Sequence, residues 1–266
     1  MDIDCLDFVY LIKPGEIGTD LRYSLRSIAK HYPNNKVWIV GYKPDWVINV
    51  NYLPIEEKNE KWKNLINDLT KACKCSEISD DFIYMNDDFL AINPTISLEE
   101  IIDSNYDLLN IRAERYKQPN LAKIKWHNAF TQTYDLLDKL NIEKPYYDYE
   151  LHLPLKINKK KFLEVISLPE VQTFIKTSEV LHYRSLYKNY DKPEKSLTLT
   201  SDVKVLKNKD ISKQKIKICG WLSMADGLIR NMKFSYLNEL LRQNLSQPCK
   251  YETIKEKSKK DKYLKF

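Results

Sequence analysis

Apolar residues in the first third of the chain follow two patterns that alternate along the sequence. The stretches LDFVYLI (6–12), KVWIVG (36–41) and DFIYMNDDFL (81–90) are short and rich in β-branched and aromatic residues, which predicts three buried strands. Residues 19–32 and 57–75 instead place apolar side chains at helical spacing, which predicts a helix in each gap. An order of strand, helix, strand, helix, strand indicates an α/β domain with a mostly parallel sheet flanked by helices.

The C-terminal half has a less regular pattern. Residues 97–110 predict a capped helix followed by a strand, and residues 128–141 predict another helix. Residues 148–166 read as an extended piece that ends at Pro154, with a helix from about Lys159. Residues 217–245 predict a strand, a turn and an amphipathic helix.

These patterns suggest one domain rather than two. The chain has 266 residues, enough to bury a substantial core. We expect a single domain over residues 1–250, with an insertion around 105–135 and a basic C-terminal tail at 251–266.

The third predicted strand runs into two adjacent carboxylates, Asp87 and Asp88. Like charges side by side repel, and removing them from water is costly unless a cation pairs with them. Ligands of open parallel sheets bind at the carboxyl ends of the strands, where this pair stands. Because Mg²⁺ and Mn²⁺ prefer oxygen ligands, the pair predicts a divalent metal that could bridge a diphosphate. The alternative is a helix cap or a solvated turn.

Three basic residues could meet an anionic ligand at the same edge. Lys13 follows the first predicted strand, and Arg22 and Arg26 lie four residues apart on the next helix, so both project from one face. Arginine is the forked donor suited to phosphate. The alternative for the two arginines is a surface pairing with Asp20 or Glu16.

Two of the four histidines lie in short polar motifs. In YDYELHLP, an extended backbone would put Asp148, Glu150 and His152 on one face, as candidates for acid–base work or metal binding. The alternative is a packed histidine at the end of a strand.

The second motif is LHYRSLYKNY. It contains His182, with Arg184 as a candidate catalytic cation and Tyr187 and Asn189 as candidate substrate-binding residues.

Charge and composition limit the possible partners. The net charge is +6, with lysines concentrated in residues 204–217 and in the tail, which favours an anionic partner, although solvated loops are the simpler explanation. There is no glycine-rich phosphate loop. We see no signal peptide and no apolar run long enough to span a membrane, and the five cysteines form no zinc set, so we expect reduced thiols in a cytoplasmic protein.

Several of these blocks together resemble a known family. The stretch DLRYSLRSIAKHYPNNKVWIVGYKPDW followed by DFIYMNDDFL is similar to the second conserved region of the Stealth family of sugar-phosphate transferases, and LHLPLKI resembles its later His-x-Pro region. Small phage-encoded proteins described as glycosyltransferases share these blocks, an RSLY block and a closing stretch like WLSMADGLIR. The opening motif of the Stealth family is only partly matched by FVYLIKPG.

The resemblance implies a GT-A-like (Rossmann-like) fold and a metal-dependent glycosyltransferase that uses a nucleotide-sugar donor with Mg²⁺ or Mn²⁺. It assigns Asp87 and Asp88 to the metal and nucleotide, His152 to the catalytic region and Arg184 to the diphosphate region. A hydroxyl acceptor on a hydroxymethylated pyrimidine of phage DNA is our first expectation. The alternatives are sugar-1-phosphate transfer to a polysaccharide or glycan, and a binding module without enzymatic activity.

Overall fold

The structure is a computed structural model of the whole chain. It describes residues 5–14, 18–56, 61–92, 97–117, 124–177, 180–193, 198–199, 204–205, 220–225 and 236–253. No helix among these residues is long and apolar enough to cross a membrane.

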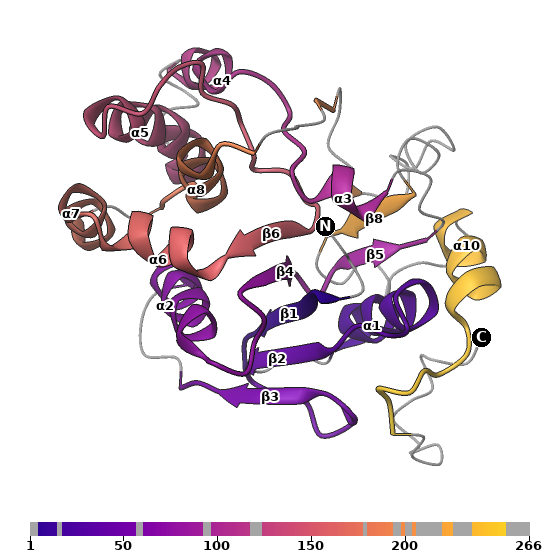
Figure 1. Cartoon of the computed structure of the whole chain (residues 1–266). Coiled ribbons are helices and arrows are strands. Elements are labelled where there is room, and N and C mark those ends of the chain that lie inside the picture. Colours follow the sequence, from indigo (N-terminus) through magenta and orange to yellow (C-terminus); the bar gives the residue numbers. More distant parts are fainter. Residues whose placement is uncertain are drawn as a thin grey trace.

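A five-stranded sheet forms the centre of the molecule (Figure 1). Its strands lie in the order β3-β2-β1-β4-β6, and the first four are parallel while β6 pairs antiparallel with β4. The strand bounds are β1 Asp7–Ile12, β2 Val37–Gly41, β3 Asn51–Pro54, β4 Asp81–Met85 and β6 Leu155–Asn158. The predicted parallel α/β sheet is thus confirmed.

Each face of this sheet is covered by its own apolar core. On one side, side chains such as Val9, Phe82 and Ile157 pack in the same cluster as residues of α2 (Lys61–Lys74), α6 (Lys159–Ser167) and α8 (Tyr183–Asp191). On the other side, Phe8 and Ile83 pack in a cluster with α1 (Thr19–His31). Since successive side chains of a strand point to opposite faces, the unbroken apolar runs are what a sheet covered on both faces requires.

Helix α1 packs directly on β5 (Phe89–Ala91) because its facing residues are small. Ser24 donates to the carbonyl of Phe89, and the amide of Ala91 donates to the Ser27 hydroxyl. Before the helix, Gly18 has φ +74°, and a Cβ there would lie 2.7 Å from the Trp46 ring, so the entry to α1 requires glycine.

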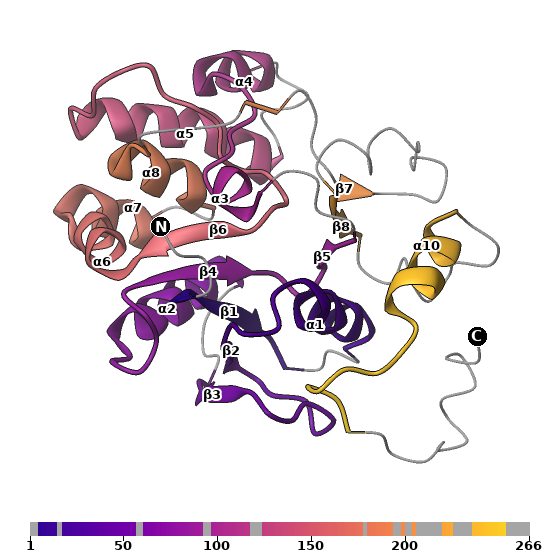
Figure 2. The same cartoon turned by 45° about the vertical axis from the view of Figure 1, so that its right-hand side comes forward.

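A smaller sheet and the remaining helices complete the structure. The small sheet has the order β5-β8-β7, with β7 at Lys204–Val205 and β8 at Trp221–Met224. The other helices are α3 Leu98–Ile101, α4 Leu109–Tyr116, α5 Lys125–Lys139, α7 Pro169–Thr177 and α10 Tyr236–Leu245. Figures 1 and 2 place α2, α6 and α7 on the side away from β8 and α10.

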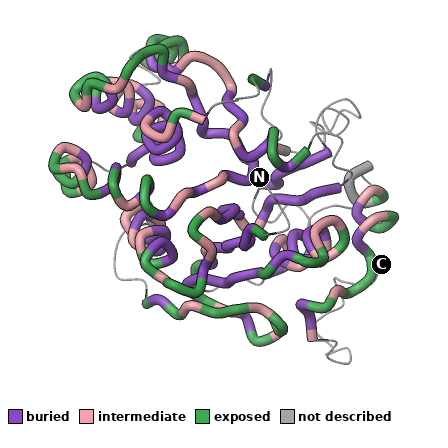
Figure 3. Tube along the Cα trace, viewed as in Figure 1, coloured by how far each residue is buried: buried purple, intermediate pink, exposed green. Residues whose placement is uncertain are grey.

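Burial along the trace follows these layers (Figure 3). The central strands β1, β2 and β4 are buried almost throughout, while β3 at the sheet edge is mostly exposed. The exposed, polar β3 was missed by the sequence pattern because it has no apolar run.

Two predicted strands are corrected by the structure. The predicted strand 81–90 breaks at Asn86–Asp88 into β4 and β5, which belong to different sheets, because the chain turns there between the two. The strand expected after the helix that starts at Leu98 is instead the start of α4. The helix itself has the predicted cap, since Ser97 and Glu100 bond reciprocally.

Candidate functional site

The turn between β4 and β5 brings Asp88 to the carboxyl edge of the parallel sheet. Asp88 is only 8% exposed, and its carboxylate accepts a hydrogen bond from the hydroxyl of Ser223 on β8. Burial raises the pKa of Asp88, while this hydrogen bond and the charges of Lys204 and His152 act in the opposite direction. A carboxylate held in this way at a ligand-binding edge is a candidate for function.

His152 and Lys204 meet beside this carboxylate. The Lys204 ammonium on β7 lies 3.1 Å from Nε2 of His152, close enough to donate a hydrogen bond to it. Both side chains are partly exposed. Four segments, around residues 88, 152, 204 and 223, therefore join an acid, an imidazole, an ammonium and a hydroxyl at one place.

Asp87 and Lys13 lie at the same edge of the sheet. Asp87 follows β4, and its charge acts on the buried Tyr10 hydroxyl, whose pKa is raised mainly by burial. Lys13 follows β1, the strand parallel to β4, and is exposed. Next to Asp87, Asn86 accepts a 2.5 Å hydrogen bond from the Tyr84 hydroxyl, which helps to hold the turn.

The segment that carries His152 is held by helix α8. Arg184 Nη1 donates to the carbonyls of Leu151 (3.0 Å) and Leu153 (2.7 Å), the two neighbours of His152. The guanidinium of Arg184 also lies over the Tyr84 ring, 5.2 Å from its centroid. Arg184 is 5% exposed. It therefore links the His152 segment to the end of β4.

Further hydrogen bonds extend this contact towards residue 147. The Tyr149 amide donates to the Ser185 hydroxyl, and the Ser185 amide donates to the Glu150 carboxylate. The Asn189 side chain accepts from the Tyr147 amide and donates to the Tyr147 carbonyl. The polar face of α8 thus acts as a template that fixes the backbone leading to His152.

Glu150 and Asp148 point into the protein beside this template. Burial raises the pKa of Glu150 to about 7, with nearby Arg184 acting against the rise. Asp148 is 1% exposed and lies 3.2 Å from Arg112 Nε. Of the three residues that the sequence groups on one face, His152 is the one that lies against Lys204.

The other residues of the LHYRSLYKNY motif are also internal. His182 Nε2 lies 3.0 Å from the Trp126 carbonyl, and burial lowers its pKa to about 3, which keeps the ring neutral. The Tyr187 hydroxyl accepts from the Asn158 amide at 2.8 Å. The described contacts of Tyr187 and Asn189 are thus with other groups of the protein itself, and their expected substrate contacts stay predictions.

Arg22 and Arg26 do share one helix face, and they meet a carboxylate there. Arg22 lies 2.9 Å and Arg26 lies 2.7 Å from the carboxylate of Glu252, whose side chain is 1% exposed. Arg22 also stacks over the Trp46 ring at 3.9 Å. This clamp attaches the C-terminal segment to α1, so packing continues past residue 250. Residues 254–266 lie outside the described part of the chain.

The residues present suit a hard divalent cation that keeps part of its own ligand shell. Asp87 and Asp88 supply two carboxylates, and among the described residues no group of three His, Cys, Asp or Glu gathers as a metal cluster. Mg²⁺ commonly binds through one or two carboxylates, waters and substrate phosphates, so two carboxylates at the carboxyl edge of the sheet fit it.

Sequence reasoning did not single out two of the site residues. Ser223 looks like one more strand residue, and only its position opposite Phe89 in the β5–β8 pair brings it to Asp88. The sequence pattern places Lys204 among the lysines of a charged loop at 204–217, but Lys204 lies on β7 against His152. Residues 206–219 lie outside the described part.

Comparison with known proteins shows what this architecture resembles. No protein-family model matches the chain, and no curated protein sequence does. The solved galactosyltransferase LgtC in complex with donor and acceptor sugar analogs is similar at a TM-score of 0.50 and 11% identity, over 91% of this chain and 98% of that one. A second structure, an active-site mutant of LgtC, is similar at a TM-score of 0.52 and 12% identity, over the same shares of the two chains. With its parallel sheet, antiparallel β6 and small second sheet, the chain has a GT-A fold.

Proposed function

We propose that the chain is a glycosyltransferase that moves a sugar from a nucleotide-sugar donor to a hydroxyl acceptor. One observation carries the proposal: Asp88, His152 and Lys204 come together at the carboxyl edge of a GT-A sheet. This group combines a carboxylate, a base and a cation, which is what transfer from a diphosphate leaving group to a hydroxyl requires.

The reaction assigns one task to each of these side chains. The acceptor oxygen forms a bond to the anomeric carbon of the sugar, the bond from that carbon to the diphosphate oxygen breaks, and the acceptor proton passes to the imidazole of His152. Lys204 then balances the negative charge on the departing diphosphate. His152 is preferred over Asp148 and Glu150 as the base because those two carboxylates are buried against α8 and Arg112.

Asp87 and Asp88 would hold Mg²⁺ or Mn²⁺ at this edge. When bound, such an ion neutralises the diphosphate as it leaves. Lys13, at the end of the neighbouring strand β1, would contact the nucleotide. We assign Arg184 to positioning, because its Nη1 group already donates to the two carbonyls that flank His152.

The acceptor we favour is a hydroxymethylated pyrimidine in DNA, on the basis of the resemblance to phage-encoded proteins and the net charge of +6. Such an enzyme must flip the base or act on an exposed strand. Sugar-1-phosphate transfer to a glycan, which the Stealth resemblance favours, is the second candidate. A binding module that keeps the fold is the third.

A donor screen separates these candidates. The purified protein is mixed with a panel of nucleotide sugars, with Mn²⁺ or EDTA, and with hydroxymethylated or unmodified DNA, and the released nucleotide is identified. Nucleoside diphosphate release that needs both Mn²⁺ and hydroxymethylated DNA supports the proposal. Nucleoside monophosphate release supports sugar-phosphate transfer. No release from any donor, with any acceptor tested, supports the binding module.

A matched pair of variants tests the assignment of Lys204. Lys204→Gln should slow turnover at least about tenfold, because a charge aimed at the leaving group is lost. Lys139→Gln removes the same charge from the exposed end of α5 and should leave turnover unchanged. Equal rates for the two variants would remove Lys204 from the reaction.

A further inference from the structure

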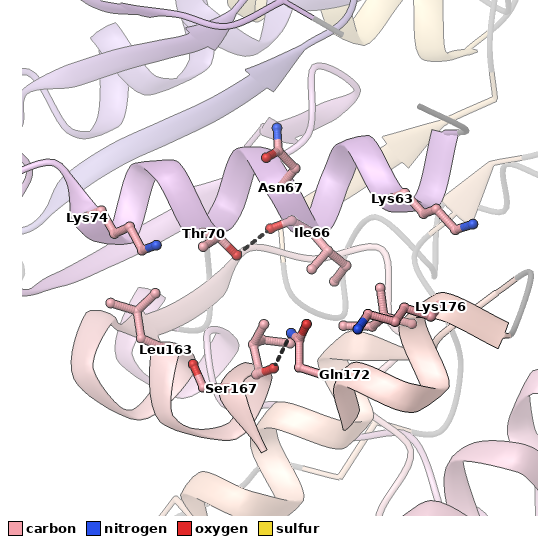
Figure 4. A pocket seen from close by; sticks show the side chains of 11 residues that line it. Lys63, Ile66, Asn67, Thr70, Lys74, Leu163, Ser167, Gln172 and Lys176 are labelled. Atoms are coloured by element: carbon pink, nitrogen blue, oxygen red, sulfur yellow. Dashed lines mark hydrogen bonds between the residues drawn. The ribbon is translucent and has the colours of Figure 1, made fainter. Parts of the chain in front are cut away.

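A second concave surface lies outside the candidate site, between α2 and the pair α6–α7 (Figure 4). Its cavity volume is about 620 Å³. The helices that form it, α2, α6 and α7, lie on the side of the molecule away from β8 (Figures 1 and 2). No residue of the candidate site lines the groove. It is therefore separate from the proposed transfer reaction.

Lysines stand at both ends of this groove. Figure 4 shows Lys74 at one end and Lys63 and Lys176 at the other, with Ile66 and Gln172 between them. Among the described residues, no carboxylate lines the groove, and the three lysines form no ion pair with another residue of this part of the chain. The surface is thus a cationic groove whose lysines are not neutralised by any acidic residue in the described part of the chain.

The floor between the lysines is largely apolar. It is formed by Ile66 from α2, Leu163 and Ile166 from α6, and Ile175 from α7. The polar groups nearest the floor are already used, since Thr70 donates to the Ile66 carbonyl and Gln172 to the Ile166 carbonyl. A ligand there would bury apolar surface in the middle and meet charge at the ends.

The spacing of the lysines matches a helix. Lys63 and Lys74 lie eleven residues apart on α2, which is about 16 Å, or three turns. A helix lying along α2 with acidic residues three turns apart would pair with both, and its intervening apolar side chains would cover the floor. Nucleic acid fits less well, because its phosphates need charge along the whole contact and gain nothing from an apolar floor.

We propose that this groove, which we call the α2–α7 groove, docks an acidic amphipathic helix of a partner protein. The partner is recognised by acidic residues about three turns apart, one near Lys74 and one near Lys63 and Lys176, on the edge of an apolar stripe. This inference does not depend on the proposed function.

The test uses a synthetic helical peptide as the probe. Its sequence carries Glu residues eleven positions apart with Leu between them at helical spacing, and a control peptide has the two Glu replaced by Lys. Binding to the full-length chain is measured by fluorescence anisotropy. We expect the acidic peptide to bind at least about tenfold more tightly than the basic one, since each exposed ion pair contributes up to about 1 kcal/mol.

Two variants of the chain locate the binding. One variant removes the charges of the groove, Lys63→Gln/Lys74→Gln/Lys176→Gln, and it should bind the acidic peptide at least about tenfold more weakly. The other makes the same charge change elsewhere, Lys30→Gln/Lys117→Gln/Lys139→Gln, and its affinity should be unchanged. Ser167→Trp fills the groove at an exposed lining position without changing charge and should weaken binding by a similar factor.

Three results would overturn the proposal. One is no difference in affinity between the two peptides. Another is equal loss in both triple variants, which would mean a general charge effect. The last is that the acidic peptide does not bind, whereas a short DNA duplex binds the chain and loses affinity only in the variant without the groove lysines. The groove would then be a nucleic-acid surface. Circular dichroism of each variant checks that it is folded.

Discussion

The candidate site and helix α8 lie next to each other and use polar residues in opposite ways. At the site, side chains from segments far apart in sequence meet one another, as Asp88 meets Ser223 and His152 meets Lys204. On α8, polar side chains bind the backbone of one neighbouring segment, as Arg184 and Asn189 do. The first arrangement leaves charged atoms at the carboxyl edge of the sheet, and the second uses polar atoms to support the structure. The same polar residue types occur in both arrangements, so the sequence alone does not distinguish them.

The Arg22–Arg26 pair shows the same difference. It looks like a phosphate clamp in sequence, but both guanidiniums meet the buried Glu252. A charged pair on a helix therefore needs its tertiary partner before a role can be assigned to it.

The largest effect is expected at Asp88. Asp88→Asn keeps the size of the side chain and a hydrogen-bonding group for Ser223 but removes the charge, so we expect turnover to fall at least about hundredfold with little change in the free energy of unfolding. Nucleotide release measures turnover, and Asp135→Asn, at an exposed position of α5, is the control. If Asp88→Asn is as active as the control, Asp88 does not belong to the active site.

Arg184 should show the opposite profile, a large loss of stability. Arg184→Met leaves the carbonyls of Leu151 and Leu153 without their donor, and we expect the free energy of unfolding to fall by about 3 kcal/mol. Urea denaturation measures this, with the exposed Arg115→Met on α4 as a control that should change it by less than about 0.5 kcal/mol. If Arg184→Met lost turnover at unchanged stability, Arg184 would belong to the reaction instead of the support.

Glu150 should make stability depend on pH. Its folded pKa of about 7 lies above the ordinary glutamate pKa of 4.5, so the folded state holds a proton that the unfolded state releases between these two pH values. The stability that Glu150 contributes is therefore present below pH 4.5 and is lost as the pH rises through about 7. Glu150→Gln has no titrating group at this position and does not lose this stability. As the pH rises from 4.5 to about 7, the free energy of unfolding of the variant should therefore increase by roughly 3 kcal/mol relative to that of the unsubstituted chain.

The measurement for Glu150 is urea denaturation of both proteins across that pH range. Taking the difference between the two proteins removes the contribution of groups distant from Glu150. His182, whose lowered pKa acts in the opposite direction, lies 3.8 Å from the Glu150 carboxylate, so His182→Gln is introduced into both proteins. A difference that stays constant with pH would contradict the assignment of a raised pKa to Glu150.

The smallest effect is expected at Arg26. Arg26→Ala breaks its pairing with Glu252 while Arg22 remains, and we expect about 2 kcal/mol less stability with an unchanged KM for the donor. Thermal unfolding and donor titration provide the two readouts, and Lys30→Ala one turn further along α1 is the control. A raised KM for the donor at unchanged stability would instead support the phosphate-binding role for Arg26 that the sequence suggests.

Much of the fold could be predicted because local patterns and packing agree. The runs that became β1, β2 and β4 are apolar after their first residues because both sheet faces are covered. The spacing of apolar residues in α1 and α2 marks the sides that pack on the sheet. The exposed β3 and the break after β4 were not visible, because neither depends on an apolar period.

The sequence by itself determined the parallel α/β architecture and placed Asp87 and Asp88 at its carboxyl edge, because the alternation of strands and helices along the chain and the ends of apolar runs are local properties. Only the tertiary structure decided which polar residues meet. Ser223 and Lys204 reach Asp88 and His152 through pairing in the second sheet, and Glu252 reaches Arg26 across 226 positions of sequence. Such contacts depend on how distant segments pack, and the hydrophobic pattern of each segment carries no record of its partner.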